Sequence, residues 1–267
     1  MNSPNALLSS RLLQAGFRHA FFTRLGGSSP APFDSLNFSI SVGDSPSNVS
    51  ANLASAASLL GVPAELIFYL DQIHSDFVFP VDRSHYAATF RKRQGDAVVS
   101  HDPNVACAAR FADCAPVLIA DQASGAVVAV HSGWRSTAQN ICGAAVRALQ
   151  NLTGNPLSLI AAVGPHIEAC CFEVGDDVAR TLQSASPAHD VLRPGKRDRP
   201  HVDLRSVIHA QLLAAGVAEN AIDHVRGCTV CDGDKFFSYR REGARSGRMM
   251  AAIVARNNEV SEAARAS

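Results

Sequence analysis

Three side chains in this sequence are of the types that hold a catalytic metal ion. Cys114 lies in the stretch ADCAP (112–116), His131 opens HSGWR (131–135), and His74 closes QIH (72–74). Zinc binds thiolate and imidazole readily, and a catalytic zinc keeps three protein ligands and one position for water or substrate. Cys114 and His131 are both expected where a strand meets a loop, a common place for functional sites. From their types alone, a core cysteine and ordinary histidines remain the alternative.

A predicted β-hairpin bears on the distance between the first two of these residues. Segments 117–120 and 126–131 are typical of strands, and the turn-rich stretch 121–125 joins them. If Ala120 pairs with Ala126, Cys114 faces Ser132 and lies within one residue of His131 across the hairpin. A slip of one residue would exchange the faces that the side chains occupy. The hairpin therefore predicts proximity and leaves a shared face open.

A candidate anion site follows the hairpin. The stretch GWRS (133–136) leads into an expected helix, whose free N–H groups favour anions, and Arg135 offers a two-pronged contact to phosphate. The alternative is that Arg135 pairs with a carboxylate and Trp134 only packs. Asp113, beside the cysteine, is either an orienting or proton-carrying group or an aspartate that shapes its loop.

Interspersed helices and short strands must position these residues. A helix is expected over 46–60, because Ser45 can cap its start, Pro46 suits its first turn and Gly61 can end it. Apolar periodicity predicts further helices over 136–152, 172–182 and 203–215, and strands over 66–70, 77–81, 97–100, 105–110, 236–239 and 248–254. Short hairpin links imply antiparallel pairing. The expected fold class is α/β of a mixed, α+β-like kind: a single layered domain, 1–267, of mixed β-sheets covered by helices.

Composition narrows the possible partners and the compartment. The 267 residues carry 24 basic and 24 acidic side chains, and nucleic-acid binding needs an excess of clustered Lys and Arg, so no nucleic-acid partner is expected. No apolar run approaches the ~18 residues of a membrane span, and the start lacks a secretory pattern. We therefore expect a cytoplasmic protein without a membrane partner. Since heptads and extended apolar stripes are missing from the sequence, a monomer is expected.

The remaining cysteines give a weaker signal. Seven cysteines, an odd number, argue against a disulfide-bonded secreted protein, and reduced thiols are expected. Cys228 and Cys231 have the CxxC spacing, but a structural zinc site needs a second pair. Because Cys170 and Cys171 are adjacent rather than spaced, they are predicted to be poor partners, and all four are predicted to be structural or incidental thiols.

The motifs together resemble the laccase-domain family, also called the polyphenol oxidase or peptidoglycan editing factor family. The resemblance extends from Phe21 to Val254, and it is specific in the order and combination of its pieces. These are FTRLGGS (22–28), SLN (35–37), VGD (42–44), QIHS (72–75), GDA (95–97), ADCAPV (112–117), HSGWR (131–135), GPHI (164–167), CFEVG (171–175), FFSYRR (236–241) and SGRM (246–249).

This resemblance implies site residues and a cofactor. Members of the family are regarded as zinc-dependent purine nucleoside phosphorylases. Matched motif by motif, their zinc ligands and catalytic centre correspond to His74, Cys114 and His131. Arg24 and Arg135 are then candidates for phosphate contact, and Asp113 is a candidate beside the substrate.

The implied activity is phosphorolysis of adenosine, inosine, guanosine and methylthioadenosine, with purine nucleosides and phosphate as small-molecule partners. Deamination of adenosine is also implied, since zinc lowers the pKa of water. Two other activities stay open for the same ligands. One is an amidase that edits peptidoglycan precursors such as UDP-MurNAc-amino acids. The other is copper-dependent polyphenol oxidation, which is disfavoured because multicopper oxidases use many histidines in concert. A non-catalytic binding module, a different class, would have a fourth protein ligand on the metal.

Overall fold

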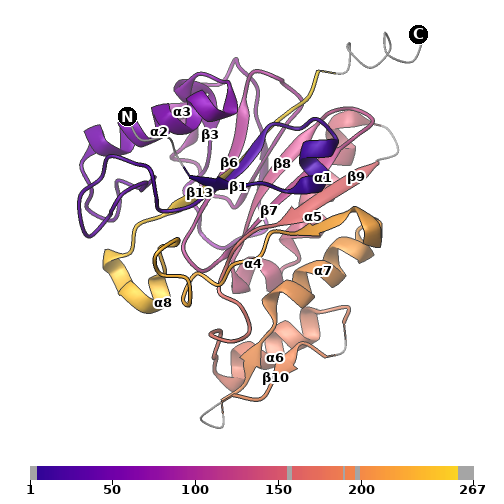
Figure 1. The fold of residues 1–267 in the computed structure, drawn as a ribbon. Helices are drawn as coiled ribbons and strands as arrows, with labels where there is room; N and C mark the ends of the chain where they lie inside the picture. Colours follow the sequence, from indigo (N-terminus) through magenta and orange to yellow (C-terminus); the bar gives the residue numbers. More distant parts are fainter. Residues whose placement is uncertain (1–4, 155–157, 189, 196–198, 258–267) are drawn as a thin grey trace.

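Two β-sheets lie face to face between layers of helices in the computed structural model, which describes residues 5–154, 158–188, 190–195 and 199–257 (Figure 1). The first sheet, five-stranded over the described residues, runs β1 (Ala6–Leu7), β2 (His19–Phe22), β13 (Met249–Val254), β6 (Ala106–Phe111) and β3 (Ile67–Phe68). The second, six-stranded, runs β12 (Ile222–His224), β9 (Leu159–Val163), β7 (Ala115–Asp121), β8 (Val127–Ser132), β5 (Ala97–Ser100) and β4 (Val78–Pro80). A small ribbon pairs β10 (Leu192–Arg193) with β11 (His201–Val202).

Helices pack around both sheets. The helices of the described residues are α1 (Ser10–Gln14), α2 (Pro46–Leu60), α3 (Ala87–Phe90), α4 (Trp134–Ala138), α5 (Ile141–Thr153), α6 (Asp176–Ala185), α7 (Leu204–Ala214) and α8 (Tyr239–Glu242). Short 3-10 turns lie at Ala64–Leu66, Glu219–Ala221 and Gly243–Arg245. Helix α2 packs on the five-stranded sheet, whereas α5 and α7 pack on the six-stranded sheet. The predicted mixed, layered α/β fold is confirmed.

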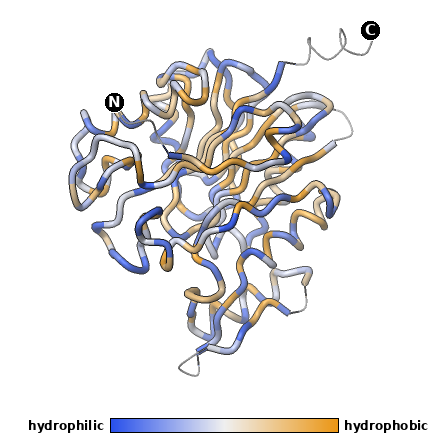
Figure 2. Tube along the Cα trace, viewed as in Figure 1, coloured by the Kyte–Doolittle hydropathy of each residue, from blue (hydrophilic) through white to orange (hydrophobic). Residues whose placement is uncertain are grey.

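The layers follow from the alternation of side chains along each strand. On β13, Met249 and Ala251 pack between the sheets, while Met250 and Ala252 pack under α2. Strands that are buried on both faces are apolar almost throughout, and Figure 2 shows these hydrophobic strands inside a hydrophilic set of loops. No helix of the described residues is long and apolar enough to cross a membrane.

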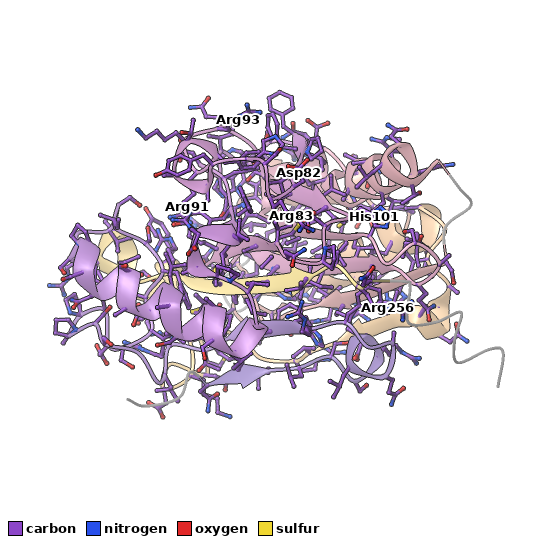
Figure 3. All side chains as sticks on the ribbon, turned by 90° about the horizontal axis from the view of Figure 1, so that it is seen from above. Asp82, Arg83, Arg91, Arg93, His101 and Arg256 are labelled. Atoms are coloured by element: carbon purple, nitrogen blue, oxygen red, sulfur yellow. The ribbon has the colours of Figure 1, made fainter. Side chains whose placement is uncertain are left out.

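Figure 3 shows the side chains from above and labels several ionisable ones, among them Arg83 and Arg256. Arg83 pairs with Asp102 at 2.7 Å. Arg256, just after β13, donates to the carbonyl oxygens of Ala15 and Gln122 at 2.6 and 2.5 Å. Arg256 therefore fastens the end of the central strand β13 to segments on both sides of it.

Local signals placed α2 correctly, and tertiary contacts changed three other predicted elements. The predicted 172–182 helix begins only at Asp176, because the backbone of Phe172 and Val174 bonds to Val202 and Pro200. Segment 236–239 is not a strand; the Phe236 side chain is buried between the sheets, and its carbonyl accepts from Arg241. The predicted 136–152 helix is two helices, α4 and α5.

The break between α4 and α5 lies at Asn140. This residue has the left-handed backbone conformation (φ 57, ψ 51), and its side chain accepts a hydrogen bond from the Gly143 N–H at 3.1 Å. An asparagine tolerates this conformation better than most residues. The interruption at Asn140 ends α4 close to β8, the strand that precedes it, and turns the chain so that α5 packs over the six-stranded sheet.

We predict that Asn140→Ala lowers the free energy of unfolding by about 1–2 kcal/mol, because it removes the cap and strains a left-handed residue. Asn140→Gly should cost only a few tenths of a kcal/mol, since glycine adopts this conformation freely and is tolerated as a cap. Urea denaturation of both variants measures the difference. Equal losses for alanine and glycine would contradict this explanation of the break.

Candidate metal centre

The structure brings His74, Cys114 and His131 together at one end of the second sheet. His74 Nε2 lies 3.7 Å from Cys114 Sγ, and the ring centroids of the two histidines are 5.0 Å apart. One ligand atom from each of the three residues lies within 4.8 Å of the others. His74 comes from the loop between β3 and β4, Cys114 immediately precedes β7, and His131 lies near the end of β8. Three separate segments thus converge on one point.

The register of the β7–β8 hairpin differs by one residue from the predicted register. Pro116 pairs with His131, and Asp121 donates its N–H to Ala126, so the turn is tighter than an Ala120–Ala126 pairing would make it. Residues opposite each other share a face, and so do residues two apart on one strand. In this register Cys114 and His131 therefore lie on the same face, the one that packs against the first sheet.

Asp96, at the start of β5, holds both histidines. Its carboxylate accepts from His131 Nδ1 at 2.8 Å, from the His74 N–H at 3.0 Å, and from the N–H and hydroxyl of Ser75 at 2.6 and 2.8 Å. The bond to Nδ1 leaves His131 Nε2 free for an ion, as in many metal sites. His74 has a left-handed backbone (φ 62), a strained conformation for a residue with a Cβ, which these bonds support. Sequence analysis gave Asp96 no role, although it lies in the quoted GDA motif.

The electrostatics of the cluster favour a thiolate. Burial opposes ionisation of Cys114, but His131 and His74 outweigh it and lower the pKa of Cys114 to about 6. Burial also disfavours a charged His131, yet Cys114 and Asp96 raise the pKa of His131 to about 9. Burial alone would raise the pKa of Asp96, whereas its bonds to His131 and Ser75 hold that pKa below the usual range. These shifts favour a thiolate at Cys114 beside an imidazolium at His131, and a metal ion would take the place of the His131 proton.

Gly133 provides the space for these ligands. A Cβ atom there would lie 2.5 Å from His74 Cδ2 and 3.0 Å from Cys114 Sγ. Its backbone (φ −76, ψ 169) suits any residue, so the requirement for glycine is steric. A soft thiolate and two imidazoles, crowded in this way, are a donor set suited to zinc or copper. The residues present therefore fit a transition-metal ion.

A cavity of about 550 Å³ opens over the three side chains, within the range of small-molecule sites. Four arginines line it: Arg110, Arg135, Arg240 and Arg248. None of their guanidinium groups takes part in an ion pair among the described residues. Aromatic side chains of Trp134, Phe172 and Tyr239 form other parts of the wall. The cavity thus combines a metal-binding group, unpaired positive charge and flat apolar surface.

The other sequence candidates differ in their placement. Arg135 lines the cavity and lies over the Trp134 ring at 4.3 Å, but the helix that begins there, α4, has only five residues. Asp113 also lines the cavity; its carboxylate accepts from the Thr229 hydroxyl and the Arg240 N–H, both at 2.6 Å. This arrangement makes Asp113 a link between loops.

Arg24 is not part of the cavity lining. Its guanidinium donates to the carbonyls of Asp34 and Gly233, contacts Glu242 at 3.4 Å and covers the Phe237 ring. Sequence reasoning missed Arg110, Arg240 and Arg248 as lining residues. Arg240 and Arg248 lie in the FFSYRR and SGRM motifs, which were a signal for them, whereas Arg110 lies within an ordinary strand pattern.

Comparison with known proteins gives a consistent set of relatives. The family described as "Multi-copper polyphenol oxidoreductase laccase" matches residues 18–256. The purine nucleoside phosphorylase of Deinococcus radiodurans is 37% identical over 235 residues, which cover 88% of each chain. The purine nucleoside phosphorylase YlmD of Geobacillus stearothermophilus is 34% identical over 248 residues, which cover 90% of each chain. The crystal structure of YlmD from Geobacillus stearothermophilus superposes with a TM-score of 0.86 at 30% identity, covering 96% of this chain and 100% of that one. The Bacillus licheniformis protein YfiH gives 0.87 at 30% identity, covering 95% and 97%.

We predict that Gly133→Ala loses most of the metal bound at this centre while keeping its fold, because the added methyl group displaces His74 and Cys114. Elemental analysis measures the metal, and circular dichroism checks the fold. Cys114→Ala provides the reference for complete loss at this site. Full metal occupancy in Gly133→Ala would show that the ligands do not meet here.

In metal-free protein, alkylation of Cys114 by iodoacetamide should reach half its maximal rate near pH 6, because the thiolate is the nucleophile. Peptide mapping separates Cys114 from the other thiols. Asp96→Asn should shift this midpoint upward, because it removes a charge that keeps His131 protonated. A midpoint near pH 8.5, the value of a free cysteine, would contradict the thiolate–imidazolium pair.

Proposed function

The chain belongs to the multi-copper polyphenol oxidoreductase laccase family, and on this premise we propose that it is a zinc-dependent purine nucleoside phosphorylase. The observation that carries the proposal is the cavity over His74, Cys114 and His131, where arginines without carboxylate partners lie beside a metal-binding group. Its proposed substrates are adenosine, inosine, guanosine and methylthioadenosine together with phosphate. The names of the curated relatives support this assignment.

The proposed zinc ligands are His74 Nε2, Cys114 Sγ and His131 Nε2, which are also the proposed catalytic centre. Three ligands leave a coordination position toward the cavity, and bound zinc would supply Lewis-acid polarisation there. Copper is less well supported by the side chains. Multicopper oxidases need many histidines, and of the metal-capable groups among the described residues only this one contains histidine.

Positive charge on the cavity wall supports phosphate as the second substrate. Burial, with the nearby Arg248 also contributing, lowers the pKa of Arg110, and the buried Arg110 Nε has no hydrogen-bond partner in the described structure. Burial likewise lowers the pKa of Arg248. An anion bound between these groups would relieve their mutual repulsion and accept two-pronged hydrogen bonds. We propose that Arg110, Arg248 and the more exposed Arg135 hold phosphate.

The aromatic wall supports a purine as the other substrate. Phe172 and Tyr239 offer flat faces on which a base stacks, and base–aromatic stacking contributes about 1–3 kcal/mol per base. Asp113 acts as a positioning residue, because it ties the cysteine loop to Thr229 and Arg240. The proposed ligands and lining residues all belong to one chain, which supports our proposal of a monomer, and the free thiols of the described cysteines support our proposal of a cytoplasmic protein.

The test is release of free base from inosine by purified, zinc-loaded protein, with and without phosphate. We expect hypoxanthine and a ribose phosphate only when phosphate is present, and inosine from adenosine as a second activity. Cys114→Ala should lower turnover by at least ~100-fold, since it removes a ligand of the catalytic ion. Arg248→Gln should raise the KM for phosphate more than the KM for inosine.

Arg83→Gln is the matched control, because Arg83 pairs with Asp102 and does not line the cavity. This variant should keep the wild-type turnover and the wild-type KM values for phosphate and inosine. Hydrolysis of a UDP-MurNAc-amino acid without phosphate-dependent base release would contradict the phosphorylase assignment and favour an editing amidase. If copper-loaded protein oxidised phenols and neither of the other activities was detected, both the phosphorylase and the amidase assignments would be contradicted.

A further inference from the structure

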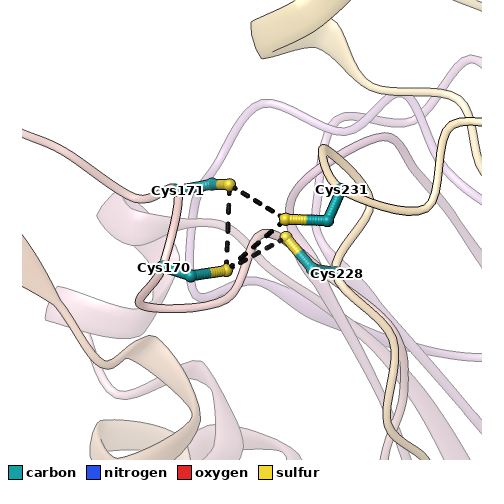
Figure 4. Close-up of side chains that lie close together, drawn as sticks. All are labelled: Cys170, Cys171, Cys228 and Cys231. Atoms are coloured by element: carbon teal, nitrogen blue, oxygen red, sulfur yellow. Dashed lines mark hydrogen bonds between the residues drawn. The ribbon is translucent and has the colours of Figure 1, made fainter.

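A second cluster of metal-binding side chains lies outside the candidate centre. Cys170, Cys171, Cys228 and Cys231 meet where two loops face each other, and all four sulfurs lie within 4.8 Å of one another (Figure 4). The prediction that the adjacent pair is a poor partner for the CxxC pair is wrong. The adjacent residues Cys170 and Cys171 can both join the cluster because the loop at 166–172 turns their side chains toward the 228–231 turn.

The distances between the sulfurs match those around a single tetrahedral ion. Cys170 Sγ lies 3.7, 3.6 and 3.7 Å from the sulfurs of Cys171, Cys228 and Cys231, and Cys171 Sγ lies 3.4 Å from that of Cys231. Four sulfurs at about 2.3 Å from zinc, in a tetrahedron, are separated by roughly 3.8 Å. These four distances lie near this value, and the other two sulfur pairs lie within 4.8 Å, so the cluster has about the size of a four-thiolate zinc site.

Disulfide pairing explains the same arrangement less well. The four thiols are free, and a disulfide requires sulfurs about 2.05 Å apart. Adjacent residues have Cα atoms about 3.8 Å apart, which is shorter than the usual 4.4–6.8 Å of a disulfide. Cys170 is also nearly equidistant from its three neighbours, so no pair is favoured. A central ion accounts for this symmetry.

The loops around the cluster are arranged to hold it. The His166 N–H donates to the Gly227 carbonyl, and the Thr229 N–H donates to the His166 carbonyl, so the two loops run as a short parallel bridge. Arg240 donates to the Cys171 carbonyl at 3.1 Å, and Arg241 donates to the Thr229 carbonyl at 2.7 Å. These arginines bring positive charge to a group that would carry two net negative charges with zinc bound.

The cluster adjoins the cavity of the candidate metal centre. Phe172, which follows Cys171, lines the cavity, and so does Ile167, whose N–H donates to the Asp113 carbonyl at 2.9 Å. Thr229, within the CxxC turn, donates its hydroxyl to the Asp113 carboxylate. The position of the cysteine pairs therefore sets the position of the loop that carries Cys114.

We propose that Cys170, Cys171, Cys228 and Cys231 bind a second, structural zinc ion, which clamps the 166–172 loop to the 227–232 loop beside the active cavity. A site with four thiolates is closed and has no position for substrate, so its role is to stabilise. It is distinct from the His74–Cys114–His131 group, with which it shares no ligand.

Zinc content per chain tests this proposal without any assay of activity. The full-length protein is purified under reducing conditions, treated with chelating resin to remove loosely bound ions, and analysed by native and elemental mass spectrometry. We expect about two zinc ions per wild-type chain and about one in Cys231→Ser, in Cys170→Ser and in Cys114→Ala. The double variant Cys114→Ala/Cys231→Ser should contain almost none. Cys142→Ala, a buried cysteine outside both groups, is the control and should keep two.

Cobalt identifies the donors. Cys114→Ala loaded with Co²⁺ should show the strong thiolate charge-transfer absorption of a four-sulfur site, and Cys231→Ser should show only the weaker absorption of a one-sulfur site. Cys231→Ser should also melt several degrees lower than wild type in the presence of zinc. Absence of zinc from Cys114→Ala, a disulfide among the four cysteines in freshly purified protein, or iron in place of zinc would each overturn the proposal.

Discussion

The buried carboxylate of Asp96 is the constraint on which the candidate centre depends. It bonds to the imidazole of His131 and to the backbone N–H groups of His74 and Ser75, so one side chain fixes two ligands that are 57 residues apart in the chain. The ligand loop has an unfavourable left-handed backbone at His74, and these bonds offset its cost. A carboxylate in this position also makes the His131 ring more basic and orients it for a metal ion.

Charge balance explains how so many ionisable groups coexist in a largely apolar fold. The thiolate of Cys114 and the ring of His131 stabilise each other, and Asp96 stabilises the same ring. Across the cavity, burial works against the charge of Arg110 and Arg248, whereas the nearby Cys114 and Asp113 favour the charge of Arg248. Neither guanidinium group takes part in an ion pair among the described residues, so this side of the cavity is complementary to an anion.

Sequence reasoning succeeded where the determining contacts are local. The helix 46–60 was predicted to the residue, because Ser45 and Gly61 define its ends through neighbours in sequence. It failed where distant segments contribute. The register of the β7–β8 hairpin also depends on the pairing of β8 with β5 and of β7 with β9, and the proximity of Cys170 to Cys228 depends on the whole β9–β12 crossover. The role of Asp96 also depends on tertiary contact, since an aspartate before a strand has no distinctive local pattern.

Anomalous diffraction at the zinc absorption edge, recorded from a crystal of the zinc-loaded protein, tests the central claim most directly. The account predicts a peak about 2.0–2.3 Å from His74 Nε2, Cys114 Sγ and His131 Nε2, with the fourth ligand a solvent atom that faces the cavity. A peak bound by a fourth side chain, or no peak between these three residues, would contradict it. The first result would mean a closed structural site, and the second would mean that Asp96 aligns the histidines for another purpose.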